Sequence, residues 1–168
     1  TPTYTGLKDS DSLTGLTQTY GSKNVLDTDG STLSVSAYTL NDGNNGGNYT
    51  VVMQPSTGTI TPKTLTAGLT GAVEKVYDGT AAATLTSANY SALSGIISGD
   101  AVSLNYATSG SYVDKHVNLN GDKAVSVSGL SLTGGDAGNY QLASTLSADI
   151  GAITPKTLTA GLTGTVEK

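Results

Sequence analysis

Short runs in which apolar and polar residues alternate recur along the chain. Val102, Leu104 and Tyr106 alternate with polar residues, and residues 33–37 and 146–150 repeat the pattern. A period of two places the apolar side chains on one face of a strand. Apolar residues at helical spacing are nearly absent, and Gly, Thr and Ser are too dense for stable helices. The pattern predicts an all-β chain.

Turn-forming pairs such as Asp78-Gly79 and Gly99-Asp100 separate these runs at short intervals. The pattern predicts seven to nine strands, at residues 63–69, 73–77, 83–86, 101–106, 111–113, 124–127, 130–132, 140–143 and 146–153. That number of short strands in about 90 residues is typical of an antiparallel immunoglobulin-like β-sandwich. We therefore predict tandem modules of this fold class.

A change of phase occurs at matching places in two parts of the chain. The apolar positions shift by one between Val127 and Leu130, and again between Val35 and Tyr38, which predicts a bulge or bend that exchanges the faces. Each shift precedes a loop that is rich in Gly, Asn and Asp and ends in Gly-Asn-Tyr. The tyrosine should begin a strand with its ring in the core. The two parts are therefore predicted to share a fold.

The strongest signal is a repeated segment. Residues 60–75 read ITPKTLTAGLTGAVEK and residues 153–168 read ITPKTLTAGLTGTVEK, so two copies 93 positions apart differ only at Ala72 and Thr165. A fixed internal period indicates a tandem array. The period predicts a module at residues 1–61 that lacks its first strand, a complete module at 62–154 and the first strand of a following module at 155–168.

A Thr-Pro-Lys sequence marks the joint in each copy, at Thr61, Pro62 and Lys63 and at Thr154, Pro155 and Lys156. Proline fixes its own φ and restricts the preceding residue, so the joint should limit bending between neighbouring modules. A module without its first strand exposes an unpaired edge. We expect residues 156–168 to fill that gap in a neighbouring copy of the chain by strand exchange, or else to lack order.

Composition narrows the classes of function. With a net charge of -5 and no Arg, the chain lacks a basic surface for nucleic acid. No apolar run approaches the roughly 18 residues of a membrane span, so we expect no membrane insertion. The chain has no Cys, which excludes disulfides and thiolate metal sites and is common in large secreted bacterial proteins.

The residues of a catalytic site are missing. His116 is the only histidine, and it lies beside Asp114 and Lys115 at a predicted exposed strand end, where we expect a solvated surface side chain. The sequence has no Gly-x-Ser-x-Gly elbow, no phosphate-binding loop and no pair of histidines for zinc. We predict that the chain is not an enzyme and has no cofactor.

Acidic turns and one long loop are the remaining candidates for binding. The sequence Asp-Thr-Asp-Gly at residues 27–30 resembles the start of a calcium loop but lacks the glutamate of an EF-hand. The weak calcium candidates are Asp27, Asp29, Asp42 and Asp136. The alternative, which we favour, is that these residues form tight turns. A carbohydrate could bind the loop that contains Asn41, Asp42, Asn44, Asn45, Asn48 and Tyr49.

Several motifs in succession resemble a known family. The central part contains VYDGT (76–80), SGD (98–100), DKHV (114–117), KAVSVSGLSLTGGDAGNYQL (123–142) and ITPKTLT (153–159). This order resembles the YDG-type repeat of large bacterial surface proteins. The first part, with YTGLKDSDSL (4–13) and GNYTV (47–51), is similar to the related MBG-type repeat.

This resemblance implies an extracellular location on the bacterial cell surface, in long adhesins similar to filamentous haemagglutinin. In such adhesins these repeats are taken to form immunoglobulin-like stalk or adhesive modules. The expected function is therefore a structural stalk that extends a distal binding region. The alternative is a module that binds host glycan or biofilm polysaccharide. Calcium or a Lys–Asn isopeptide bond could stiffen such a chain, and the sequence leaves both open.

Overall fold

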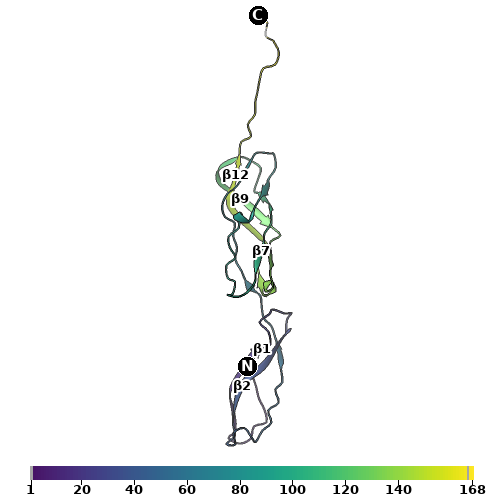
Figure 1. Ribbon diagram of the computed structural model, residues 1–168, viewed down its shortest axis with the longest axis vertical. Coiled ribbons are helices and arrows are strands. Elements are labelled where there is room, and N and C mark those ends of the chain that lie inside the picture. Colours follow the sequence, from purple (N-terminus) through teal and green to yellow (C-terminus); the bar gives the residue numbers. More distant parts are fainter. Residues whose placement is uncertain (1, 166) are drawn as a thin grey trace. The chain divides into compact units, whose positions relative to one another are not determined.

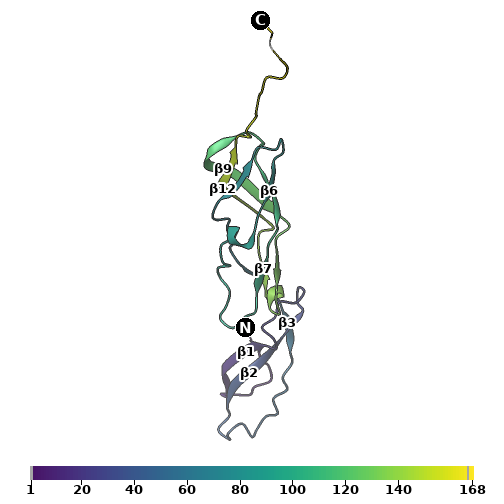
Figure 2. The same cartoon turned by 45° about the horizontal axis from the view of Figure 1, so that its top comes forward.

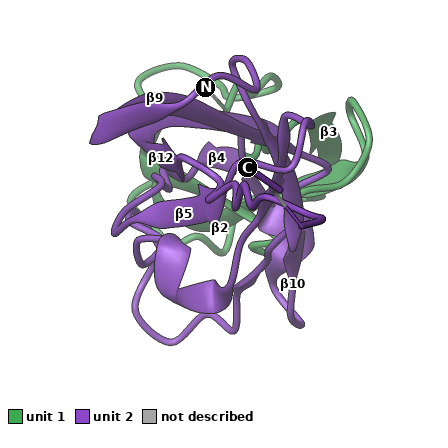
Figure 3. Ribbon diagram, turned by 90° about the horizontal axis from the view of Figure 1, so that it is seen from above, with its two compact units in different colours: residues 1–62 green, residues 63–168 purple. Residues whose placement is uncertain are grey.

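The computed structural model describes residues 2–165 and 167–168. The chain divides into two compact units, residues 1–62 (unit 1) and 63–168 (unit 2), which Figure 3 colours separately. The division falls inside the first predicted joint. The described residues contain strands, turns and two short 3₁₀ segments but no α-helix, so the prediction of an all-β chain is confirmed.

Unit 1 contains an antiparallel sheet of three strands in the order β1-β2-β3. These strands are β1 (Ser12–Tyr20), β2 (Ser31–Asn41) and β3 (Ser56–Gly58), and β1 and β2 run side by side in Figures 1 and 2. Val35 lies opposite Gln18 and Ala37 opposite Thr17, so Ser36 is an extra residue in β2. This bulge lies where the phase of the apolar positions was predicted to change.

The described residues of unit 2 form nine strands and two 3₁₀ segments. They are β4 (Lys63–Thr64), β5 (Val73–Val76), β6 (Ala82–Thr84), η1 (Ser87–Asn89), β7 (Ser103–Asn105), β8 (Ser109–Tyr112), β9 (Asn118–Ser128), β10 (Ser131–Thr133), η2 (Ala137–Asn139), β11 (Tyr140–Gln141) and β12 (Thr145–Thr154). Five strands form one sheet in the order β5-β12-β9-β8-β6, while β7 pairs with β10 and β4 with β11. Every strand overlaps a predicted segment.

The second predicted change of phase is also present. Strand β9 ends at Ser128, and Gly129 adopts a φ of 78°, which glycine reaches without a steric penalty. The chain then continues into β10, with Leu130 only 6% exposed. Gly129 therefore separates two strands that alternate in opposite phase.

The first and last segments of unit 2 run parallel to each other. Lys63 and Thr64 of β4 pair with Tyr140 and Gln141 of β11, and the four residues of β5 pair with the end of β12. Both pairings are parallel, although the other strand pairs of the unit are antiparallel. The chain therefore enters unit 2 at one end and leaves it after Thr154 at the opposite end.

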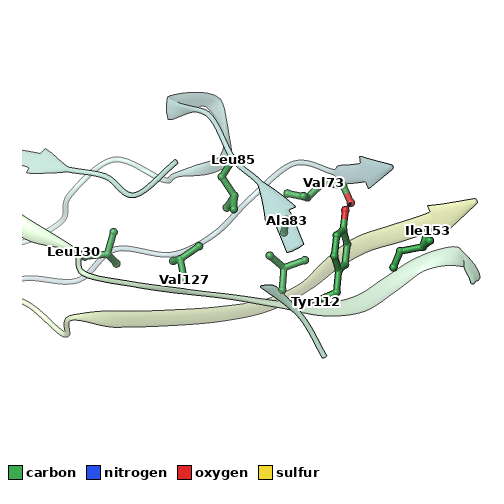
Figure 4. Packing of buried hydrophobic residues seen from close by; sticks show 8 residues of the cluster. Val73, Ala83, Leu85, Tyr112, Val127, Leu130 and Ile153 are labelled. Atoms are coloured by element: carbon green, nitrogen blue, oxygen red, sulfur yellow. Dashed lines mark hydrogen bonds between the residues drawn. The ribbon is translucent and has the colours of Figure 1, made fainter. Parts of the chain in front are cut away.

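One cluster of buried residues forms the core of unit 2. Figure 4 shows the cluster formed by Val73, Ala83, Leu85, Tyr112, Val125, Val127, Leu130 and Ile153. Val125 and Ile153 are fully buried. The hydroxyl of Tyr112 donates a hydrogen bond of 2.9 Å to the carbonyl oxygen of Val73, so the largest core side chain also has its polar atom satisfied.

The sheet of unit 1 repeats three strands of unit 2. Tyr20 lies opposite Leu33 as Tyr112 lies opposite Val125, and the next two pairs along these strands keep the same register. We call residues that occupy equivalent positions in the two units counterparts. β1 and β2 are thus the counterparts of β8 and β9, and β3 is the counterpart of part of β12.

The counterparts differ sharply in burial. Val125 is 0% and Tyr112 3% exposed, whereas Leu33 is half-buried and Tyr20 is 40% exposed. Among the described residues, every buried apolar side chain belongs to unit 2. Unit 1 therefore has the strands of the module but not a closed core.

The two copies of the repeated segment occupy different environments. Leu65 of the first copy is 2% exposed, whereas its equivalent Leu158 in the second copy is 89% exposed. Leu162, the equivalent of the half-buried Leu69, is 100% exposed. The described residues after Thr154 form no strand. The strand that the sequence predicts there is therefore not formed in this chain.

Candidate functional site

Each Gly-Asn-Tyr tyrosine binds a turn, which precedes β1 in unit 1 and β7 in unit 2. In unit 2 the Tyr140 hydroxyl donates to the Asp100 carboxylate (2.6 Å) and accepts the Ile97 amide (3.1 Å). In unit 1 the Tyr49 hydroxyl donates to the Asp11 carboxylate (2.6 Å) and accepts the Lys8 amide (3.1 Å). We call this arrangement the tyrosine–aspartate contact.

The contact explains the predicted role of these tyrosines only in part. Tyr140 is 6% exposed and begins β11, as predicted, but its hydroxyl binds a carboxylate as well as a backbone group. Tyr49 is half-buried and lies outside any strand. The hydrogen bond to Asp11 raises the pKa of the Tyr49 hydroxyl above its usual value of 10.0. The sequence signal was an Asp about 40 positions before each Gly-Asn-Tyr.

The tyrosine–aspartate contact also shows which residues before the first strand of unit 1 correspond to residues of unit 2. Gly6 (φ 95°) precedes Asp11 by five positions, as Gly95 (φ 101°) precedes Asp100. Tyr4-Thr5-Gly6 is therefore the counterpart of Leu93-Ser94-Gly95. Unit 1 contains counterparts of residues from about 91 onward, and none of residues 63–90.

Residues 77–80 form a turn that Lys75 holds closed. The Asp78 carboxylate accepts hydrogen bonds from the Lys75 ammonium group and from the amide of Thr80, each at 2.9 Å. Gly79 adopts a φ of 86°. The bond from Lys75, followed by those from Thr80, lowers the pKa of Asp78 from 3.8 to about 2. Tyr, Asp and Gly at this place are therefore turn residues with a structural role.

The repeated segment is bound along both of its sides in unit 2. On one side, the Leu65 amide donates to the Gln141 carbonyl oxygen at 2.8 Å. On the other, Thr66 and Ser94 exchange backbone hydrogen bonds. The buried Asn89 side chain donates to the carbonyl oxygens of Thr70 and Ala72, at 3.4 and 3.2 Å. Asn89 is a structural residue that the sequence did not identify.

The candidate carbohydrate loop is organised from within by Asp42, which is 8% exposed. Its carboxylate accepts the backbone amides of Asn44, Gly46 and Asn48 at 2.8–2.9 Å. These bonds, that of Asn48 foremost, lower the pKa of Asp42. Asn45 adopts a φ of 50°. The side chain of Asn41 donates instead to Ser12 and Thr14 of β1.

The calcium candidates do not form one site. The backbone carbonyl oxygen of Asp27 accepts a hydrogen bond from the Gly30 amide. Asp29 adopts a φ of 57°, and its carboxylate accepts a hydrogen bond of 3.4 Å from the Thr59 hydroxyl. Asp136 belongs to unit 2, where its carboxylate accepts the Ala101 amide at 2.9 Å. Among the described residues, no three His, Cys, Asp or Glu side chains come together as a metal-binding group. Each candidate serves a turn.

The joints are exposed at both ends of unit 2. Thr61, Pro62 and Lys63 are exposed, although the backbone of Lys63 pairs with Tyr140. At the other joint, Pro155 and Lys156 are exposed and Thr154 remains in the sheet. The Thr154 carbonyl oxygen accepts the Tyr77 amide at 2.8 Å. The regular structure of the unit therefore ends directly before the second proline.

One buried lysine was not anticipated from the sequence. The Lys123 ammonium group is 2.5 Å from a carboxylate oxygen of Asp114, and its side chain is 5% exposed. This ion pair lowers the pKa of Asp114, which also accepts the His116 amide. His116 itself is exposed. The DKHV motif therefore supplies the partner for a buried charge.

Unit 1 contains a groove with a volume of about 900 Å³. It is lined by residues of β1 and β2, among them Leu13, Leu33 and Val35, and by residues of the segments 2–7 and 49–56. Tyr4, Tyr38 and Tyr49 also line it. The groove lies where the counterparts of residues 63–90 would stand, because the same face of unit 2 is covered by Val73, Ala83 and Leu85.

The described residues include no helix that is long and apolar enough to cross a membrane. No curated protein and no solved structure matches the chain. The family model of the YDG domain matches residues 61–148, which is more than half of the chain. This match includes the Lys75–Asp78 turn, the Asp114–Lys123 pair and the tyrosine–aspartate contact of unit 2. The chain belongs to the YDG domain family.

Proposed function

We propose that the chain is part of the structural stalk of a secreted or surface-anchored bacterial adhesin, in which tandem modules extend a distal binding region. The observation that carries this proposal is the parallel pairing of β4 with β11 and of β5 with β12. It separates the entry of the chain from its exit by the length of the module. A module built in this way adds its own length to an array.

The repeated segment supports the same proposal. It contains the joint and the first strands of the module, so its near-identity in two copies preserves both the fold and the junction between modules. Repeat proteins of this kind add stability module by module through nearest-neighbour contacts. We further propose that the complete module is an immunoglobulin-like sandwich, with the five-stranded sheet as one layer and the pairs β7–β10 and β4–β11 in the other.

The absence of cysteine and of a membrane-spanning run is consistent with an extracellular protein of this class. The tyrosine–aspartate contact and the Lys75–Asp78 pair hold turns, and the Asp114–Lys123 pair neutralises a buried charge. These structural roles support a non-catalytic function. In this proposal the stiffening elements are the tyrosine–aspartate contact, the Lys75–Asp78 turn and the Asn89 side chain.

Small-angle X-ray scattering of chains with one, two and three copies of the 93-residue period tests the stalk. The maximum dimension should grow by a constant increment with each copy. A matched series with Pro155→Gly in every joint should give smaller increments, because glycine allows bending that proline prevents. Dimensions that grow as for a compact cluster would contradict the stalk.

A second candidate function is supported by the groove of unit 1. It is concave and lined by three tyrosines, and a stalk does not require such a feature. In this alternative the groove and the loop at residues 41–48 bind a host glycan or a biofilm polysaccharide, since tyrosine combines an apolar ring with a hydroxyl.

A glycan array probed with the full chain tests the alternative. Binding that is lost in Tyr38→Ala and kept in Tyr106→Ala, an exposed tyrosine of unit 2, would favour a carbohydrate site over a stalk. No binding by either the chain or its variants would leave the stalk as the function of this region.

A further inference from the structure

We propose that Asn120 is a site of spontaneous deamidation, which converts a neutral bulge of β9 into an acidic one. The chain contains two Asn-Gly pairs, Asn45-Gly46 in unit 1 and Asn120-Gly121 in unit 2. Glycine after asparagine favours this reaction, because it has no Cβ atom to hinder the approach of its nitrogen to the asparagine side chain. The two pairs have different surroundings, and these surroundings select Asn120.

The reaction needs water and no enzyme. The backbone nitrogen of Gly121 attacks Cγ of Asn120, and the bond from Cγ to Nδ2 breaks. The proton of the Gly121 amide leaves with Nδ2 as ammonia, so a five-membered succinimide ring remains. Water then opens the ring at either carbonyl carbon, and the product is aspartate or isoaspartate. An NH2 group is thereby exchanged for an OH group that ionises, so a chain with a net charge of -5 gains one negative charge.

Asn120 lies in a bulge where β9 interrupts its pairing with β12. Between the pairs Asn118–Ile153 and Lys123–Gly151, four residues of β9 stand against a single residue of β12. The extra residues of a bulge are left outside the ladder, so their backbone can move while the pairs on either side persist. Ring closure requires such movement, because the glycine nitrogen must approach the asparagine side chain.

The Asn120-Gly121 pair is also open to solvent. Both residues are exposed, and a Cβ atom placed on Gly121 would have no neighbour within 4 Å. The backbone amide of Asn120 donates to Oδ1 of Asn118 at 2.8 Å, whereas its side chain makes no hydrogen bond within the described part of the chain. Neither a contact nor a hydrogen bond of that part therefore holds the Asn120 side chain away from the Gly121 nitrogen.

Exposure of this bulge is a property that the two units share. Its counterpart in unit 1, residues 27–30, is exposed as well, although the chain continues from unit 1 into unit 2. Thr28 and Asp29 hold the positions of Asn120 and Gly121. Asp29 has a φ of 57° and Gly121 a φ of 73°, so both turns use a left-handed residue at the same place. Only unit 2 combines this turn with asparagine.

The other Asn-Gly pair is held by Asp42. Its carboxylate accepts the Gly46 amide at 2.8 Å, together with the amides of Asn44 and Asn48. Attack by the Gly46 nitrogen requires the loss of its proton, and the charge of Asp42 opposes a second negative charge beside it. A charge-assisted hydrogen bond must also be broken. Asn45 should therefore react slowly.

The unit should keep its fold after the reaction. The ladder with β12 continues at Asn118 and at Lys123, and the new carboxylate is exposed. It stands two residues from Asp122, whose carboxylate already accepts the Asn118 side chain at 2.9 Å. Because Asn118 lies opposite Ile153, the added charge appears near the end of β12 at Thr154. This chemistry is independent of the proposed stalk function, but in a stalk it would make the end of such a module more acidic with age.

Peptide mapping by mass spectrometry compares both Asn-Gly pairs within one molecule. When the full chain is incubated near neutral pH, aspartyl and isoaspartyl peptides should accumulate at Asn120 at least about tenfold faster than at Asn45, because a hydrogen bond to a charged group opposes only the latter reaction. In urea the two rates should become similar. Equal rates in the folded chain, faster reaction at Asn45, or a difference that persists in urea would overturn the proposal.

Variants of the full chain identify the source of the added charge. Asn120→Thr introduces the residue of unit 1 and should abolish the acidic species that ion-exchange chromatography resolves. The control Asn45→Gly removes the other pair and should leave that species in place. Asn120→Asp carries one product and should unfold at the same temperature as the parent chain. Acidic species that persist in Asn120→Thr or disappear in Asn45→Gly would refute the site, as would a folded parent that stays unmodified while the denatured chain reacts.

Discussion

Leu65 and Leu158 have the same sequence neighbours and opposite surroundings, so they isolate the effect of burial at the scale of one residue. Leu65→Ala should lower the free energy of unfolding of unit 2 by about 2–4 kcal/mol, because it removes buried methyl groups and leaves a cavity. Leu158→Ala should change it by no more than about 0.5 kcal/mol in dilute solution. Urea denaturation of the two variants gives both values, and a similar loss in both would mean that Leu158 is buried.

The Lys75–Asp78 turn predicts a pH dependence. Because the pKa of Asp78 falls from 3.8 to about 2 on folding, its contribution to stability is present above pH 4 and is lost as the pH falls through about 2. In Lys75→Gln the pKa of Asp78 should return toward 3.8, since the largest cause of the shift is removed. Carboxyl titration by NMR measures both values.

Lys168→Gln is the matched control for that titration. Lys168 occupies the position of Lys75 in the second copy of the segment and is exposed. This variant should leave the pKa of Asp78 at about 2. A similar rise in both variants would show that general charge, and not the contact with Lys75, lowers the pKa.

Residue roles were the least predictable part of the molecule. Asp42 lies in an acidic, Asn-rich loop of the kind that can bind calcium. Its carboxylate instead accepts hydrogen bonds from three backbone amides. Whether Asp serves a metal or a turn depends on how the backbone folds around it, and local sequence does not state this. Similarly, Lys123 is buried only because Asp114, nine residues earlier, folds back to it.

At the scale of elements, alternation of apolar residues was a sufficient guide to where strands lie. Each strand in this fold buries one face, so apolar and polar residues alternate along its sequence. Their ends were less predictable. Residues 63–69 were expected as one strand, but only Lys63 and Thr64 form a ladder, while Thr66 and Leu69 make isolated bridges. Register and the parallel pairing of the terminal strands depend on contacts between distant segments.

The close approach of the Tyr112 and Val125 side chains to Gly151 of β12 predicts a difference between two counterpart glycines. A Cβ atom at Gly151 would lie 2.7 Å from both Tyr112 and Val125, which are buried. Gly151→Ala should therefore destabilise unit 2 by about 1–3 kcal/mol through overpacking. At Gly58 the added Cβ would meet Tyr20 at 2.8 Å, but Tyr20 is 40% exposed and can rotate away.

Gly58→Ala is thus expected to cost less than Gly151→Ala. Thermal unfolding of the two variants, followed by near-ultraviolet circular dichroism of the tyrosines, compares them. If Gly58→Ala is the more damaging change, then Tyr20 is held more firmly than its exposure indicates.

At the scale of the whole molecule, the two units should differ in stability although they share strands and turns. Unit 1 has a groove where unit 2 has the packed residues 63–90. Few buried apolar contacts mean low local stability and fast opening. Amide hydrogen exchange should be faster in β2 than in its counterpart β9 by orders of magnitude. Equal protection of the two strands would show that unit 1 is closed in solution.

The parallel pairing of β5 with β12 also has a mechanical consequence. Tension applied through Val73 and Thr154 would pull these two neighbouring strands in opposite directions along their length, and would load their hydrogen bonds together in shear. Handles on cysteines placed at Ser128 and Thr145, which lie opposite each other at the ends of antiparallel strands, would instead unzip the bonds one by one. Forced unfolding reports the rate of barrier crossing, so single-molecule pulling should require a higher force in the first geometry. In the proposed stalk, tension along the chain would load each module in this more resistant direction.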